Sequence, residues 1–155
     1  MKYLIIIYFI ISNTLNAEEL SWNFISMITK VHETILPSGV KYLTFKSTGG
    51  STLNTGKYGL SSCSGFRADK DKKALEVRAI CNTKIDDGNE IWSELRRDRG
   101  VTSAGVGKTL IVDATGPYKE LINKECTYAL SYYDKLVFGK TKCKITKELF
   151  NKLNK

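Results

Sequence analysis

The sequence predicts an all-β protein, an up-and-down antiparallel β-barrel of about eight strands with a short C-terminal helix. Short stretches rich in apolar and β-branched residues recur along the chain, and turn-forming residues separate them at regular intervals. No long helical pattern lies between these stretches. The expected strands are Ser21–His32, Val40–Ser47, Lys57–Phe66, Ala74–Lys84, Glu90–Arg97, Gly107–Asp113, Lys124–Tyr133 and Lys135–Ile145.

The breaks between these strands carry turn chemistry. Asp87-Gly88 is a strong hairpin signal, because a two-residue type I′ turn needs positive φ at both central positions. After the last strand, Thr146 is placed to cap a helix that reaches Asn154 and puts Leu149, Phe150 and Leu153 on one face. The other expected breaks are Pro37-Ser38-Gly39, Gly49-Gly50, Gly100, Gly105 and Thr115-Gly116-Pro117.

The N-terminus is typical of a secretory signal peptide. Lys2 precedes the uninterrupted apolar run Tyr3–Ile11, and a small residue, Ala17, stands where the chain turns acidic. The run is shorter than the roughly 20 residues that a membrane-spanning helix needs. We therefore expect residues 1–17 to be a signal peptide, 18–155 to be one barrel domain, and the protein to be periplasmic or secreted. An uncleaved N-terminal anchor is the alternative, and no later segment is apolar enough to span a membrane.

The mature chain is basic. Removal of Lys2 with the signal peptide lowers the net charge from +8 to +7. Seven lysines lie between Lys135 and Lys155, offset nearby by Asp134 and Glu148. Such a region binds anionic surfaces in some proteins, and in most it is simply a solvated face.

The four cysteines predict two disulfides, since an even number is typical of exported proteins. Facing residues in a hairpin have a constant sum of residue numbers, and a two-residue turn at Asp134-Lys135 makes Cys126 face Cys143. A hairpin centred on Lys72 likewise makes Cys63 face Cys81. Each bridge would close a loop of roughly 15 residues and contribute about 3 kcal/mol. A zinc site is the weaker alternative, because the chain lacks a CxxC pair and His32 is its only histidine.

The Asp87-Gly88 turn also determines which residues of the next strand face the interior. With two residues in the turn, Cys81 faces Glu94 and Ala79 faces Arg96. The preceding strand presents an interior face by simple alternation, made by Leu75, Val77, Ala79, Cys81 and Thr83. In this register the residues opposite that face are Trp92, Glu94 and Arg96, so these three are expected to point into the barrel.

These partners predict a ligand cavity. An interior Glu–Arg pair is costly unless it is hydrogen-bonded, so such a pair often marks a site, and an eight-stranded barrel has room for one small ligand. A one-residue bulge would reverse the strand and bring Ile91, Ser93 and Leu95 inside instead, so both registers stay open. The expected ligand-binding residues are Trp92 as an apolar wall, Glu94 and Arg96 as polar anchors, and Tyr128 and Tyr132 from the face of Cys126.

Three apparent motifs are not good evidence for a nucleotide, calcium or catalytic site. Gly105–Thr109 looks like the end of a phosphate-binding loop, but Thr102 stands where that motif needs glycine and a strand follows where it needs a helix. Asp86–Glu90 is acidic enough for calcium but lacks the spacing of an EF-hand loop, and a hairpin turn explains it. A catalytic Ser-His-Asp set would have to use His32, which lies in an alternating strand.

Several short motifs occur in a characteristic order, namely Thr55-Gly56-Lys57-Tyr58-Gly59, Cys63-Ser64-Gly65, Asp86-Asp87-Gly88-Asn89, Thr115-Gly116-Pro117-Tyr118 and Cys126-Thr127-Tyr128. This order resembles that of uncharacterised exported bacterial proteins of the allene oxide cyclase and dirigent type. The resemblance covers roughly Trp22 to Lys144 and implies an eight-stranded barrel. The late loop departs from the expected Gly-Thr-Gly-Lys-Tyr, and no catalytic residue of a cyclase has a match here.

The sequence leaves the function open between different classes. The first is a binding module for a small or amphipathic ligand. The alternative is an interaction protein whose lysine-rich surface binds an anionic envelope or protein partner, and a cyclase- or isomerase-like enzyme is third. No catalytic residue, cofactor or metal ligand is assigned, and nucleic acid is not an expected partner.

Overall fold

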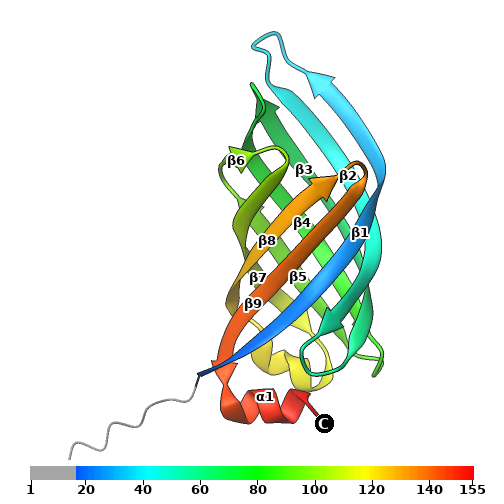
Figure 1. Cartoon of the computed structure of the whole chain (residues 1–155), viewed down its shortest axis with the longest axis vertical. Helices are drawn as coiled ribbons and strands as arrows, with labels where there is room; N and C mark the ends of the chain where they lie inside the picture. The colour runs from blue at the N-terminus through cyan, green and yellow to red at the C-terminus, as the bar shows by residue number, and fades with distance from the viewer. Residues whose placement is uncertain (1–16) are drawn as a thin grey trace, which may run out of the picture.

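The computed structural model describes residues 17–155, and their eight long antiparallel strands close into the predicted up-and-down barrel (Figure 1). The pairing of β3 with β4 completes the ring, so each of these eight strands is paired on both sides. The predicted signal peptide lies outside the described residues except for Ala17, the first residue of β1. The elements are β1 (Ala17–Ile35), β2 (Lys41–Leu53), β3 (Tyr58–Lys70), β4 (Lys73–Ile85), β5 (Glu90–Arg97), the two-residue β6 (Gly100–Val101), β7 (Ala104–Ala114), the 3-10 helix η1 (Gly116–Leu121), β8 (Glu125–Tyr133), β9 (Leu136–Thr146) and α1 (Lys147–Leu153).

Several strands are longer than the sequence predicts, and β2 is the clearest example. It runs through Gly49-Gly50, which was expected to be a break. Gly49 faces β1, and a β-carbon at this position would lie 2.4 Å from the Cα atom of Ser26. The glycine therefore allows two strands to approach closely inside the barrel rather than ending one of them.

Both predicted disulfides are present. Cys63 pairs directly with Cys81 across β3 and β4, and their Cα atoms are 4.0 Å apart. Cys126 is joined to Cys143 across β8 and β9, with Cα atoms 4.4 Å apart. Each bridge therefore ties two neighbouring strands of the barrel.

Of the two registers left open between β4 and β5, the structure has the alternative, and the register that placed Trp92, Glu94 and Arg96 inside is wrong by one residue. Cys81 faces Ser93 and Ala79 faces Leu95, so Ile91, Ser93 and Leu95 point inward. The turn contains three residues, because Ile85 N–H donates to Asn89 O (2.8 Å) and Gly88 adopts a φ of +82° at the last loop position. The extra residue moves the three predicted interior residues, Trp92, Glu94 and Arg96, to the outer face.

The predicted interior face of β4 is also interrupted at its start. Val77, Ala79 and Cys81 are buried as expected, but Leu75 is exposed and Ala74 takes the inner position. The cause is an irregularity in the β3–β4 pairing between Ala68 and Asp69.

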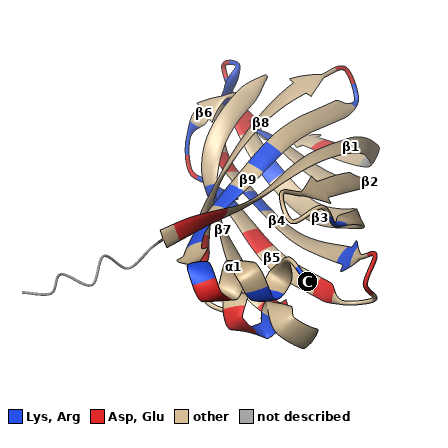
Figure 2. Cartoon of the chain, turned by 60° about the horizontal axis from the view of Figure 1, so that its bottom comes forward, with Lys and Arg blue, Asp and Glu red and all other residues tan. Residues whose placement is uncertain are grey.

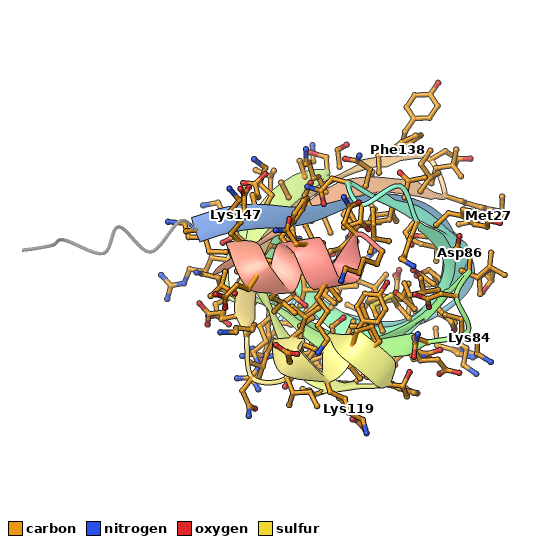
Figure 3. The ribbon with its side chains drawn as sticks, turned by 90° about the horizontal axis from the view of Figure 1, so that it is seen from below. Met27, Lys84, Asp86, Lys119, Phe138 and Lys147 are labelled. Carbon is orange, nitrogen blue, oxygen red and sulfur yellow. A yellow bond between two sulfur atoms is a disulfide. The ribbon has the colours of Figure 1, made fainter. Side chains whose placement is uncertain are left out.

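Helices η1 and α1 close one end of the barrel (Figure 1), and the view from below shows both lying across it (Figure 3). The Thr146 hydroxyl accepts a hydrogen bond from Leu149 N–H (3.2 Å), which confirms the predicted N-cap. The turn predicted at Thr115-Gly116-Pro117 opens η1 instead. No helix within residues 17–155 is long and apolar enough to cross a membrane. The core packed at this end includes Leu20, Leu53, Ile85, Ile91, Ile111, Tyr118, Leu121, Ile145, Leu149 and Leu153.

Charged residues on the outer face pair across neighbouring elements. The acidic start of β1 lies beside basic residues of β9 (Figure 2), where Lys142 Nζ is 3.0 Å from Glu19 Oε1. Lys152 of α1 pairs with Glu120 of η1. The lysine-rich C-terminal region is therefore partly neutralised by its own chain.

Candidate binding cavity

The barrel is hollow at the end away from α1. A cavity of about 340 Å³ opens there, within the range of volumes in which proteins hold small ligands. Strands from all round the barrel contribute to its wall, which is largely apolar. The apolar lining consists of Phe24, Ile28, Val31, Leu43, Phe45, Val77, Ala79, Leu95, Leu130, Val137 and the Cys63–Cys81 disulfide.

The cavity exists because small residues occupy inner positions in this half of the barrel. Ser26, Ser47 and Ala79 line it with short side chains. Gly65 carries none, and a β-carbon there would lie 2.7 Å from the Cβ atom of Ala79. Side chains this small cannot fill the space across an eight-stranded barrel, so the interior stays open.

Hydroxyl side chains separate the cavity from the packed core. Ser61 and Thr83 hydrogen-bond to each other across β3 and β4 (2.9 Å). Ser93, Thr109 and Thr141 line the same layer, around a second hollow of about 50 Å³. A ligand in the main cavity would therefore meet a polar floor.

Arg67 lies at the mouth of the cavity. Its Nη2 atom is 2.8 Å from Asp69 Oδ2, and its Nη1 donates to Thr102 O (3.4 Å). The guanidinium also lies over the ring of Tyr132, 5.5 Å from the ring centre. Because Tyr132 belongs to β8 and Arg67 to β3, this side chain reaches across the opening.

A second inward-facing arginine, Arg97, lies in the wall beside Tyr128. Both residues need a glycine on β7: a β-carbon at Gly105 would lie 1.7 Å from Arg97 Nη1, and one at Gly107 would lie 2.6 Å from Tyr128 Oη. Burial raises the pKa of Tyr128 to about 12, although the nearby Arg97 charge acts in the opposite direction. The hydroxyl is therefore neutral and a hydrogen-bond donor across the physiological pH range.

The structure brings together only part of the predicted site. Tyr128 and Tyr132 line the cavity as expected. Glu94 and Arg96 form their expected pair, with Arg96 Nε 2.8 Å from Glu94 Oε1, but on the outer face, where the hydrogen bond from Arg96 lowers the pKa of Glu94. Trp92 lies on the same outer face between Asn82 and Asp113.

Arg67 and Arg97 are the residues that the sequence reasoning missed. The alternative register contained a signal for Arg97, because alternation from Ile91 and Leu95 points Arg97 inward. Arg97 explains Gly105 and Tyr128 explains Gly107; these glycines resembled a phosphate-binding loop but instead leave room inside the wall. The acidic cluster at Asp87 is a turn, as expected, and His32 is exposed on the β1–β2 hairpin.

The lining combines an apolar wall with a few ionisable side chains. Its cysteines are both oxidised, and its ionisable side chains are Arg67, Asp134, Tyr128 and Tyr132. Within residues 17–155, no group of three or more His, Cys, Asp or Glu residues is placed to hold a metal ion. The arrangement suits an apolar molecule with one or two polar groups.

The barrel is similar to that of a solved structure. This neighbour is a conserved protein of unknown function from Rhodopseudomonas palustris, with a TM-score of 0.61 and 11% sequence identity. The match covers 83% of this chain and 97% of the neighbour, so the two share the fold. No protein-family model matches the chain, and no curated protein matches it either.

Proposed function

We propose that this chain is an exported binding module that holds one small apolar or amphipathic ligand in the open half of its barrel. The observation that carries this proposal is the asymmetry of the interior. One end is closed by helices and a packed core, whereas the other holds an apolar cavity of about 340 Å³. An enclosed apolar surface of this size binds apolar molecules because burial removes their surface from water.

Export is part of the same proposal. The signal-like N-terminus predicts it, and two disulfides between neighbouring strands are typical of proteins from oxidising compartments. The lysine-rich surface has weaker support as a binding site, since Lys142 and Lys152 already pair with Glu19 and Glu120.

The test is the binding of a neutral apolar fluorophore, N-phenyl-1-naphthylamine, to the purified, oxidised protein. Leu130 lines the cavity from β8, and its neighbour Ala129 is exposed on the outer face of the same strand. We expect Leu130→Trp to fill the cavity and weaken binding at least tenfold, a loss of roughly 1.4 kcal/mol. Ala129→Trp is the matched control and should leave the affinity within about twofold.

Thermal unfolding of both variants checks that each is folded. Failure of the wild-type protein to bind the fluorophore would contradict the proposal. Equal affinities for Leu130→Trp and Ala129→Trp would also contradict it, because they would place the fluorophore on the outside of the barrel.

A further inference from the structure

Arg97 is a buried cation that forms no salt bridge with any of residues 17–155. The residue is 3% exposed, and its Nη1 donates to Ala104 O (2.9 Å). Its Nε and Nη2 atoms are buried without a hydrogen-bond partner among the described residues. A buried charge left unpaired costs several kcal/mol, so a group such as this one calls for an explanation.

The neighbouring arginine shows how such a pair of nitrogens binds a carboxylate. Arg96 uses its Nε and Nη2 atoms to hold the two carboxylate oxygens of Glu94. The same two nitrogens are the free pair on Arg97. This side of a guanidinium matches a carboxylate in a two-bond arrangement, so the Nε and Nη2 atoms of Arg97 form a fork of the kind that binds a carboxylate.

A third free donor lies beside this fork. Tyr128 is 1% exposed, and its hydroxyl is also buried without a partner among residues 17–155. Gly105 and Gly107, neighbours on the inner face of β7, hold the two groups against the same stretch of wall. Arg67 differs: its Nε is also without a partner among the described residues, but its Nη2 pairs with Asp69 and its Nη1 donates to Thr102 O.

The free donors lie next to the cavity. Arg97 faces Val77 across β4 and β5, and Tyr128 faces Gly107 across β7 and β8. Val77 and Tyr128 both line the cavity, as does Leu95, two residues before Arg97 on the same face. Arg97 itself is not part of the cavity lining, so an acidic group would reach its Nε and Nη2 atoms by displacing the side chains between them and the cavity.

We infer that the ligand of this cavity is a small carboxylic acid whose carboxylate is held by Arg97 and Tyr128. This inference rests on the proposed function and adds the chemical class of the ligand. The carboxylate neutralises the Arg97 charge and accepts hydrogen bonds from Nε, Nη2 and the Tyr128 hydroxyl. The apolar remainder of the acid lies against the wall of the cavity.

The test compares octanoate with 1-octanol, which have chains of the same length but different charge. Each displaces N-phenyl-1-naphthylamine from the wild-type protein, and octanoate should do so at a concentration at least tenfold lower. Arg97→Met should abolish this preference while 1-octanol still displaces the fluorophore. Arg96→Met, which removes the adjacent outward-facing arginine, should keep the preference.

The melting temperature of Arg97→Met distinguishes a ligand-binding role of Arg97 from a structural one. If Arg97 is unpaired without ligand, Arg97→Met replaces a buried charge by an apolar side chain, and the melting temperature stays at or above that of the wild type. Should Arg97→Met fail to fold, the inference is overturned, because Arg97 is then structural. Tyr128→Phe gives an independent check and should weaken octanoate several-fold more than 1-octanol.

Equal displacement by octanoate and 1-octanol from the wild-type protein would overturn the inference and leave the proposed function intact. If the fluorophore itself does not bind, the proposed function fails and the inference fails with it. A preference that survives Arg97→Met but disappears in Arg67→Met would also overturn the inference, because it would place the carboxylate at the mouth.

Discussion

Gly105 and Gly107 leave room in the wall of the barrel for two larger side chains. Both face inward from β7, and the space that their β-carbons would take is filled by Arg97 and Tyr128. In a strand, glycine is normally destabilising, and it often marks a place where another group approaches closely. Here the approaching groups are polar side chains from the two neighbouring strands.

Replacement of Gly107 by alanine should therefore destabilise the protein. The new β-carbon would lie 2.5 Å from Arg96 O and 2.6 Å from Tyr128 Cζ, so backbone and ring would both have to move. We expect a loss of roughly 1–3 kcal/mol in the free energy of unfolding, measured by urea denaturation. Gly50→Ala is the control, because the nearest atom to its β-carbon would be Gly59 O at 4.0 Å. Equal stability of the two variants would contradict this account of the wall.

The β4–β5 turn connects several elements at the closed end of the barrel. Asp87 accepts hydrogen bonds from Asn89 N–H (3.0 Å) and from the Tyr118 hydroxyl of η1 (3.3 Å). Its carboxylate also pairs with Lys57 from the β2–β3 turn, at 3.1 Å. One side chain thus joins two turns to the helix that closes the barrel.

Asp87 should make the closed end sensitive to acid. Partial burial acts to raise the pKa of its carboxyl, but the hydrogen bonds from Asn89 and Lys57 outweigh it, so the pKa lies below its usual 3.8. A carboxyl whose pKa is lowered by folding stabilises the protein fully at pH values above its pKa in the unfolded state. This stabilisation is lost as the pH falls through its pKa in the folded state. Asp87→Asn should cost about 1 kcal/mol at neutral pH. That difference should shrink below about pH 4.

Urea denaturation at several pH values measures this difference. Asp86→Asn, at the exposed neighbour in the same turn (Figure 3), is the control and should have little effect at any pH. A cost of Asp87→Asn that stays constant down to strongly acidic pH would show that the carboxylate charge is not what stabilises the turn.

The same turn explains why sequence reasoning found some of the site and missed the rest. The tight turn between β8 and β9 permits only one register, so Cys126–Cys143 and the inward direction of Tyr128 could be predicted. Asp87-Gly88 suits both a two-residue turn and a three-residue turn with Gly88 last, and these place opposite faces of β5 inside. Arg97 points into the barrel only with the three-residue turn. The local sequence does not choose between the two turns, so Arg97 could not be predicted.

At the scale of the whole molecule, the barrel divides into a half that is packed and a half that is hollow. Large side chains such as Leu20, Ile111 and Tyr118 fill the interior near α1, whereas Ser26 and Ala79 leave it open at the other end. The predicted eight strands determined the architecture but not this division. It depends on which inner positions carry small residues, and that requires every register to be known.

We propose that the open half of the barrel holds an apolar ligand, and methyl NMR tests this proposal most directly. In a titration with N-phenyl-1-naphthylamine, the methyl signals of the cavity residues Val77, Leu95 and Leu130 should shift, and those of Leu20 and Leu153 at the closed end should not. Shifts confined to Leu60 and Val106, which are exposed on the outside of the barrel, would contradict the account.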